Sequence, residues 1–256
     1  MTKLLVFVVE NHSLTQMQDQ MPFTNGLAQQ YGYADHYDAI THPSLPNYLA
    51  IAGGDTFGVT DDDSPAAHPV AGASVFGTAV RAGSTARLYA EAMQQPCQSE
   101  PAGDYGVKHN PWAYFTDETA LCRQDDVPLT RLGDDVTQGH LPAVGMVIPN
   151  LCDDAHDCPL SAADAWLRTY VGRAMSGADW QSGHLAIVIT ADEDDRAHGN
   201  RILTVVAHPA LHHTVVSTPL NHYSLSRAYA DVAGVSPLRR AASATDLLRA
   251  FGLAPG

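Results

Sequence analysis

The chain is poor in positive charge. Its 256 residues contain 14 lysines and arginines against 28 aspartates and glutamates, which gives a formal net charge of −14 at pH 7. Because such a chain repels nucleic acid and anionic membranes at long range, we expect no nucleic-acid partner. An anionic substrate would therefore need a local centre of positive charge, which a bound metal ion supplies.

Long hydrophobic runs are also missing. The longest apolar segments are far shorter than the roughly 20 residues that a membrane-spanning helix needs, so we expect no stable membrane insertion. Met1-Thr2-Lys3 leads straight into an apolar run, without the apolar stretch and cleavage site of a secretory signal peptide. We therefore expect either a cytoplasmic protein or one whose leader was removed before this numbering begins.

Cysteine is scarce as well, with only four residues. Cys152 and Cys158 bracket a short loop, and Cys97 and Cys122 bracket a longer one. Two disulfides in this pairing would indicate an oxidising compartment. The alternatives are four reduced thiols, or a zinc site of Cys152, His156 and Cys158, although that spacing matches no common zinc pattern.

Two pairs of oxygen-bearing side chains each follow a continuous apolar run: Glu10-Asn11 after residues 4–9, and Asp192-Glu193 after residues 185–191. Such runs are typical of parallel strands buried on both faces, and ligands of these sheets bind at the carboxyl ends of the strands. Four oxygen donors at one sheet edge predict a site for a hard divalent cation. Taken singly, either pair could be an ordinary polar strand end.

The remaining pattern alternates short apolar strands with helical segments. Strands are predicted at 33–40, 87–89, 143–148 and 202–207, and helices at 13–30, 74–82, 161–175, 223–233 and 244–250. This alternation predicts an α/β fold with a mostly parallel sheet and helices on both faces. Because no linker or repeat stands out, we expect a single domain, 1–256, with an ordered insertion around 94–126.

A further helix is predicted to run to Gly53-Gly54. Pro46 fits its first turn, where the missing N–H costs no hydrogen bond. Ser44 would then lie near a helix N-terminus, which favours anion binding. Capping of the helix by Ser44 is an equally simple explanation of this position alone.

Five short blocks occur in order along the chain: Glu10-Asn11-His12-Ser13, His42 to Tyr48, Lys108-His109-Asn110-Pro111, Pro149 to Asp157, and Asp192-Glu193. Together they resemble the bacterial phosphoesterase family of acid phosphatases and phospholipases C, most of all its short secreted mycobacterial branch that acts on phosphatidylinositol 3-phosphate. The resemblance implies an alkaline-phosphatase-like three-layer sandwich, and it favours secretion. Asp153, Ala155 and Ala191 depart from the family pattern, which bears on the substrate rather than on the chemistry.

The resemblance also implies that Glu10, Asn11, Asp192 and Glu193 hold one divalent metal ion. These are the same four side chains that the strand ends indicate. Oxygen ligands suit Mg²⁺, Ca²⁺ or Mn²⁺, while Zn²⁺ or iron would be expected if a histidine joined them.

The segment Ser44-Leu45-Pro46-Asn47 resembles the Thr-x-Pro-Asn motif that carries the nucleophilic hydroxyl in related enzymes. A serine hydroxyl is a poor nucleophile unless a base or a metal activates it. We therefore predict that Ser44 is the nucleophile and that Asn47 holds its loop.

Three histidines lie in the matching blocks, and the family uses such residues to contact the phosphoryl group or to protonate the leaving oxygen. We rank His156 first, then His109, then His42, since an imidazole can donate or accept a proton near neutral pH. Asp154 is expected to orient His156 or to lie outside the metal ligands. Lys108 is expected to contact phosphate, or else to be a solvated surface lysine.

The sequence thus predicts a metal-dependent phosphomonoesterase that hydrolyses a small-molecule or lipid phosphate ester through a phosphoserine intermediate. A phosphodiesterase or phospholipase C using the same centre is the nearest alternative. A metal-free serine esterase is a second alternative, but this chain lacks the Gly-x-Ser-x-Gly motif around Ser44 that such an enzyme would have. A non-catalytic metal-binding protein of the same fold is the last alternative. The sequence gives no indication of the oligomeric state.

Overall fold

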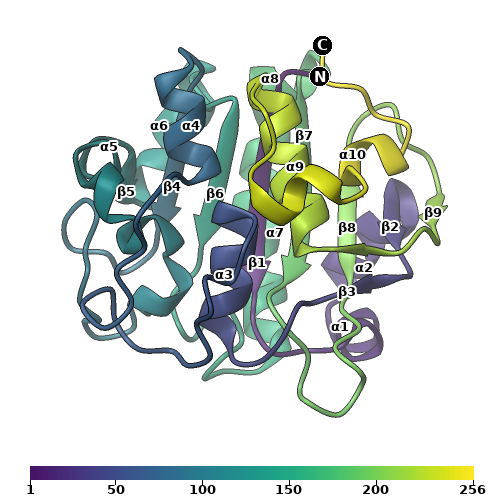
Figure 1. The fold of residues 1–256 in the computed structure, drawn as a ribbon. Coiled ribbons are helices and arrows are strands. Elements are labelled where there is room, and N and C mark those ends of the chain that lie inside the picture. The colour runs from purple at the N-terminus through teal and green to yellow at the C-terminus, as the bar shows by residue number, and fades with distance from the viewer.

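The computed structural model describes all 256 residues. Its main sheet has eight strands in the order β5-β4-β6-β1-β7-β8-β2-β9, and a small second sheet pairs β10 with β3 (Figure 1). In chain order, the strands are β1 (Lys3–Val9), β2 (Gly32–Ala34), β3 (Tyr37–Asp38), β4 (Ala86–Ala90), β5 (Asp126–Pro128), β6 (Val144–Ile148), β7 (Leu185–Ala191), β8 (Thr204–Ala207), β9 (Thr214–Val216) and β10 (Leu220–Asn221).

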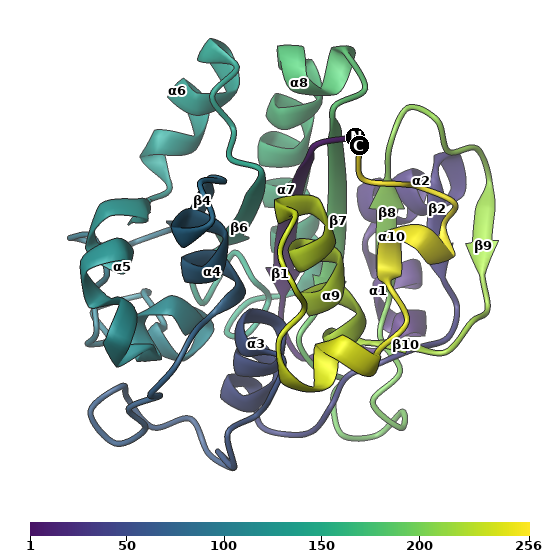
Figure 2. The same ribbon diagram turned by 45° about the horizontal axis from the view of Figure 1, so that its top comes forward.

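Helices cover both faces of the main sheet (Figures 1 and 2). One layer contains α3 (Ser44–Gly53), α4 (Val75–Arg81), α9 (His222–Ala233) and α10 (Leu247–Ala250). The other contains α1 (Leu14–Gln20), α2 (Pro22–Gln30), α6 (Thr130–Gln138), α7 (Leu160–Ser176) and α8 (Ala178–Gln181). The predicted α/β fold with three layers is therefore confirmed.

The central strands explain the continuous apolar runs of the sequence. Every residue of β6 and β7, and every residue of β1 after Lys3, is buried. Because helices pack on both sides, neither face of these strands needs polar side chains. Truncating one of these side chains, such as Leu5→Ala, is expected to cost roughly 2–5 kcal/mol of stability.

The sheet is mostly parallel, as predicted, and β8 is its antiparallel member, since it runs against both β7 and β2. The strand expected over 33–40 is divided. β2 joins the main sheet, whereas β3 pairs with β10 in the second one. Between them, Asp35 N–H and the His36 carbonyl bond to two different partner segments, so the chain passes from one sheet to the other.

Several predicted helices begin or end differently from the expectation, and the one expected over 244–250 starts only at Leu247, capped by Asp246. The helix expected over 13–30 is two helices, because Pro22 lacks an N–H and starts α2 afresh. Ser13 caps α1, and its hydroxyl accepts the Gln16 N–H. The helix expected from Ser161 starts at Leu160, with Pro159 before it and no side-chain cap.

The region 94–126 contains short helical turns and a helix rather than extended loops. Its elements are η1 (Val107–His109), η2 (Pro111–Tyr114), η3 (Thr116–Glu118) and α5 (Thr119–Asp125), whereas η4 (Arg239–Ser243) lies near the end of the chain. η1 packs against α3, which brings Lys108 and His109 beside the end of β1.

All four cysteines form disulfides in the predicted pairing, Cys97 with Cys122 and Cys152 with Cys158. No thiol is left free, so the reduced-thiol and zinc-site alternatives are wrong. None of the helices combines the length and the apolar character needed to cross a bilayer.

Candidate active site

The two acidic strand ends meet at one edge of the sheet. β1 and β7 are parallel neighbours, and Val9 pairs with Ala191, so Glu10 and Asp192 leave the sheet side by side. The Asp192 N–H donates to the Val9 carbonyl at 3.0 Å. The Asn11 N–H in turn donates to Asp192 Oδ1 at 3.3 Å. Strand order and register therefore bring together residues that are far apart in the sequence.

Three buried oxygens at this edge have no hydrogen-bond partner, namely Asn11 Oδ1, Asp192 Oδ2 and Asp154 Oδ2, the last of which lies 3.1 Å from His109 Nδ1. The backbone of Asn11 is left-handed, with φ of 48°, a conformation that asparagine tolerates better than most residues. Leaving a buried carboxylate oxygen unpaired is costly, so buried charges are usually paired or bound to a metal. These donors therefore fit a hard divalent cation.

Two further segments reach this group: the loop after β6 brings Asp154, and η1 brings the nitrogen donors of His109. The Glu10 N–H donates to the Asp154 carbonyl, beyond the end of β6, at 2.8 Å. His109 lies between the two carboxylates, with Nε2 3.3 Å from Glu10 Oε2 and Nδ1 3.1 Å from Asp154 Oδ2. One ligand atom from each of the three residues lies within 4.8 Å of the others, which is close enough to hold one metal ion.

Glu10 and His109 form a buried ion pair. Burial by itself would raise the pKa of Glu10, but the charge of His109 and its hydrogen bond lower that pKa to about 2. Burial would likewise lower the pKa of His109, but Glu10 and Asp154 raise it to about 10. Each partner thus stabilises the charged form of the other.

The second acidic pair, Asp192 and Glu193, is less well compensated, although His42 lies 3.0 Å from Glu193 Oε2. Burial and the charge of Glu10 raise the pKa of Asp192 well above its ordinary value, and they raise that of Glu193 to about 8. Burial is the larger cause of both shifts, and repulsion by the neighbouring carboxylates adds to it. A divalent cation among them would offset this repulsion.

Ser44 lies beside these carboxylates. It is the first residue of α3, it is 1% exposed, and its hydroxyl donates to Glu10 Oε2 at 3.0 Å. One turn later, the Tyr48 hydroxyl donates to Glu10 Oε1 at 2.8 Å, and the Tyr48 ring stacks on His109. The sequence analysis missed Tyr48, although its i+4 spacing from Ser44 places it on the same helix face.

The N-terminus of α3 offers fewer free donors than its position suggested. The Leu45 N–H already donates to Asp62 Oδ1 at 2.9 Å, and Pro46 has no N–H. Positive charge for an anion must therefore come mainly from side chains around Ser44.

His42 does not face the space in front of Ser44. Its Nδ1 lies 3.0 Å from Glu193 Oε2, and its Nε2 lies 3.3 Å from Asp194 Oδ1. Burial lowers its pKa, and the charge of Asp194 opposes that effect. His42 is therefore placed to hold the two acids that follow Asp192.

Asn47 holds the loop before Ser44, as predicted. Its Oδ1 accepts the Ile40 and Thr41 N–H groups, and its Nδ2 donates to the Thr41 and Pro43 carbonyls. Its Nδ2 also lies 3.4 Å from Glu193 Oε2.

A cavity of about 330 Å³ opens in front of Ser44. The residues that line it come from six segments of the chain: Asn11, Pro43, Ser44, Asp62, Lys108, His156, Glu193, Asp194, Asp195 and Arg196. Lys108 and Arg196 supply positive charge there, and no acidic partner is recorded for the Arg196 guanidinium. Arg196 and Asp62 were missed by the sequence analysis, since loop residues carry no periodic pattern.

Lys108 and His156 form one hydrogen-bonded unit in this cavity. Lys108 Nζ lies 3.1 Å from His156 Nε2 and 3.2 Å from Asp62 Oδ2, and its side chain is 17% exposed. His156 Nδ1 lies 2.7 Å from Asp157 Oδ1. Lys108 is thus not a solvated surface lysine, and among the three predicted histidines only His156 lines the cavity.

Of the two roles expected of Asp154, orienting the His156 ring does not fit the structure, whereas a place just outside the metal ligands stays a prediction. The carboxylate beside the His156 ring belongs to Asp157, while Asp154 Oδ1 accepts the backbone N–H of His156 at 2.8 Å. Ala155, between them, has a φ of 74° and reverses the chain, so the Asp154 side chain faces His109 instead.

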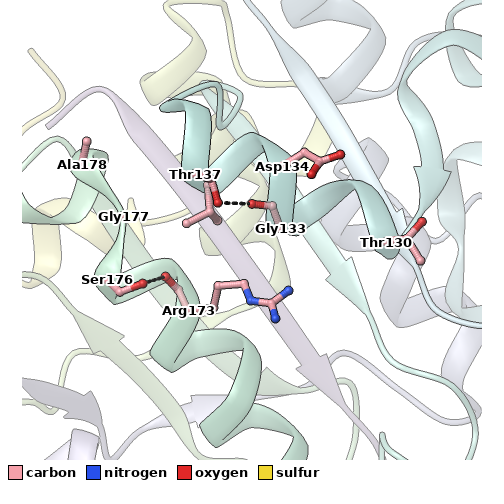
Figure 3. Close-up of a pocket in the computed structure, with 9 residues that line it drawn as sticks. Thr130, Gly133, Asp134, Thr137, Arg173, Ser176, Gly177 and Ala178 are labelled. Carbon is pink, nitrogen blue, oxygen red and sulfur yellow. Dashed lines mark hydrogen bonds between the residues drawn. The ribbon is translucent and has the colours of Figure 1, made fainter.

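A larger cavity, of about 670 Å³, lies between α6 and the end of α7 (Figure 3). Lys3, at the start of β1, contacts residues that adjoin this cavity. The cavity therefore lies at the end of the sheet opposite to Ser44. The hydroxyls of Thr137 and Ser176 donate to backbone carbonyls of their own helices, Gly133 and Arg173. This cavity brings together no buried acids and no candidate nucleophile.

Residues 7–235 match the model of the phosphoesterase family, which is most of the chain. The chain belongs to the phosphoesterase family. It is 29% identical to a phosphatidylinositol-3-phosphatase of Mycobacterium tuberculosis, over 97% of this chain and 82% of that protein. It is 30% identical to an acid phosphatase of Aspergillus fumigatus, over 78% of this chain but only 47% of that protein.

Solved structures show the same fold at low sequence identity. A protein of the alkaline phosphatase superfamily from Vibrio parahaemolyticus superposes with a TM-score of 0.64 and 11% identity, over 94% of this chain and 69% of that one. A lipoteichoic acid synthase from Listeria monocytogenes gives 0.61 and 9% identity, over 95% of this chain and 76% of that one. The predicted family, its alkaline-phosphatase-like fold and the enzyme class, a phosphoric ester hydrolase, are confirmed at this level.

Proposed function

We propose that the protein is a metal-dependent phosphomonoesterase in which Ser44 is the nucleophile. One observation carries the proposal: the Ser44 hydroxyl lies 3.0 Å from Glu10 Oε2, at the base of a cavity that contains Lys108, His156 and Arg196. A hydroxyl held by a carboxylate below a cluster of cations suits attack on a phosphate ester.

The proposed ligands of the cation are Glu10, Asn11, Asp192 and Glu193, the four that the sequence predicts. The unpaired oxygens of Asn11 and Asp192 support two of them directly. Glu193 belongs to the set through its buried position beside the others, with His42 and Asn47 positioning its carboxylate. When bound, a divalent cation lowers the pKa of an adjacent hydroxyl and neutralises charge on the phosphoryl group.

The donor set bears on which cation is bound. Oxygen ligands alone suit Mg²⁺, Ca²⁺ or Mn²⁺. His109 lies within reach of Glu10 and Asp154, and a nitrogen ligand would shift the preference toward Zn²⁺ or iron.

The protein residues divide the proposed chemistry among them. Glu10 Oε2 accepts the hydrogen of the Ser44 hydroxyl and orients its oxygen, and because the pKa of Glu10 is only about 2, the proton passes on to solvent. As the Oγ–phosphorus bond forms, the bond to the ester oxygen breaks, and the Lys108–His156 unit supplies a proton to that oxygen. Water then hydrolyses the phosphoserine. Arg196 and Lys108 stabilise the negative charge of the phosphoryl oxygens throughout.

The substrate is proposed to be a small-molecule or lipid phosphate ester, because the relatives are named as phosphatases and act on such groups. The two disulfides support a location outside the cytoplasm.

A comparison of p-nitrophenyl phosphate with bis-(p-nitrophenyl) phosphate, with and without added metal ions, tests this proposal. We expect metal-dependent turnover that favours the monoester. A preference for the diester would assign the centre to a phosphodiesterase or phospholipase C. Activity that survives exhaustive chelation would indicate a metal-free esterase, and no turnover of any ester with metal bound would indicate a binding protein.

A further inference from the structure

A second cavity adjoins the one in front of Ser44. It has a volume of about 430 Å³ and shares Asp62, Lys108 and His156 with the first cavity, so the two lie side by side with these side chains between them. Its volume lies within the usual range for small-molecule sites, roughly 300–1,000 Å³. A phosphoryl group held above Ser44 would therefore have its alcohol part beside or within this space.

Both disulfides hold segments that form the walls of this cavity. The segment enclosed by Cys97 and Cys122 contributes the wall from Glu100 to Lys108, and the loop enclosed by Cys152 and Cys158 contributes His156. The Tyr105 ring is buried in the wall, since its hydroxyl donates to the Gln98 carbonyl and accepts from Asn110. The cavity is thus formed by cross-linked segments.

The lining of this second cavity is acidic, and it lacks the second cation, Arg196, that the cavity in front of Ser44 has. Its lining contains Asp62, Asp63 and Glu100, and its single lysine or arginine is Lys108, which is already within 3.2 Å of Asp62. Besides burial, the charges of Asp62, Asp63, Asp61 and Glu100 raise the pKa of the neighbouring Tyr114. The carboxylates of Asp63 and Glu100 are exposed, and no cation is recorded as pairing with either.

We propose that this cavity, the leaving-group pocket, binds the alcohol part of the phosphate ester and favours alcohols with a positive charge or none over alcohols with a second anionic group. The inference rests on the proposed phosphatase function and adds a substrate class to it. Apolar contacts from Val107 and Leu151 would suit a carbon skeleton, while the carboxylates attract an ammonium group and repel a second anion.

Three short phosphate esters that differ in charge test the inference: phosphoethanolamine, ethyl phosphate and phosphoglycolate. For the wild-type protein at low ionic strength, we expect kcat/KM to decrease in that order. The double variant Asp63→Asn/Glu100→Gln should lower the ratio of kcat/KM for phosphoethanolamine to kcat/KM for phosphoglycolate by roughly threefold to tenfold. Using the change in this ratio cancels the intrinsic reactivity of each ester.

Two further measurements separate a charge effect from a structural one. Raising the ionic strength should lower the same ratio of kcat/KM values in the wild-type protein, because exposed charges are screened. The control variant Asp134→Asn, in the cavity at the opposite end of the sheet, should leave the ratio unchanged.

The outcomes distinguish the two proposals. If the esters are hydrolysed but the double variant leaves the ratio unchanged, or if phosphoglycolate is the preferred ester, the leaving-group pocket is wrong and the phosphatase function stands. If the wild-type protein hydrolyses no phosphate ester in the presence of metal ions, both proposals are overturned.

Discussion

The two ends of the sheet carry cavities of different size and different chemistry. The cavity at the amino end of β1 is the larger, at about 670 Å³ against about 330 Å³ in front of Ser44. In the larger one, the hydroxyls of Thr137 and Ser176 are already paired with backbone carbonyls (Figure 3). In the smaller one, buried oxygens of Asn11 and Asp192 have no partner.

Under the proposed function, buried polar atoms without partners mark the site better than cavity volume does. Parallel strands end with their carbonyls and their following side chains at one edge, and three neighbouring strands of this sheet carry acids there. The opposite edge is where helices end and chain segments turn back, and its polar groups satisfy one another. Matched variants at the two ends therefore separate a functional role from a general effect of substitution.

The largest expected difference between the two ends comes from removing a hydroxyl. Ser44→Ala should lower kcat for p-nitrophenyl phosphate by about 10³-fold or more, because no other nucleophile lies in that cavity. Thr137→Ala, which removes a hydroxyl from the other cavity, should leave kcat within about twofold. A Ser44→Ala variant that folds and keeps more than about a tenth of the activity would contradict the assignment.

Metal binding gives the next largest difference. At a Mn²⁺ concentration of about 100 times Kd, the wild-type protein should gain roughly 2.7 kcal/mol of stability. Asp192→Asn should lose most of this gain, since it removes a buried charge at the proposed site, whereas Asp134→Asn should keep it. Urea unfolding with and without Mn²⁺ measures both, and equal gains in the wild-type and Asp192→Asn proteins would refute the site.

A smaller difference in activity is expected when a cationic side chain is removed from each cavity, Lys108 from one and Arg173 from the other. Lys108→Met should lower kcat/KM by about 10- to 100-fold, because its ammonium group lies beside His156 in the cavity in front of Ser44. Arg173→Met should have no effect, although Arg173 also lines a cavity. Steady-state kinetics on both variants would show whether position, rather than positive charge in any cavity, sets the rate.

The smallest effect concerns a buried carboxylate that has its own donor. Asp126 is fully buried, Asn110 donates to its Oδ2 at 2.8 Å, and burial raises its pKa to about 8. The folded protein thus keeps this proton up to about pH 8, while the unfolded chain loses it near pH 4. The stabilisation is complete below that lower value and falls as pH rises to about 8.

Asp126→Asn removes this titration. From about pH 5 to about pH 8.5, the variant should gain roughly 1–3 kcal/mol of stability relative to the wild-type protein. Urea unfolding of both proteins, in buffer that contains a metal chelator, measures the gain. If the free energies of unfolding of the two proteins change with pH in parallel, the Asp126 carboxyl does not hold its proton in the folded state.

Much of the site could be predicted because parallel strands leave a clear pattern. Glu10 and Asp192 follow continuous apolar runs, and such runs place their ends at a shared edge whatever the loops do. Ser44 could be placed because Pro46 and the double glycine mark the ends of α3. These signals are local in the sequence, so they can be recognised without knowing how the chain packs.

The remaining residues depend on how loops fold back, which the sequence does not reveal. Asp62 and Arg196 reach the cavity from loops without periodicity. Asp154 and Asp157 both lie within two residues of His156 in the sequence, and only the backbone, with its reversal at Ala155, decides which of them faces the His156 ring. Tyr48 is different, since the helical spacing from Ser44 was sufficient to find it.

The most direct test of the account is a crystal structure grown with Mn²⁺ and orthovanadate. The account predicts an anomalous manganese peak in contact with Glu10 and Asp192, and vanadium bonded to Ser44 Oγ with Lys108 and Arg196 beside its oxygens. Vanadate bound near Arg173 in the larger cavity, or manganese away from both strand ends, would contradict it.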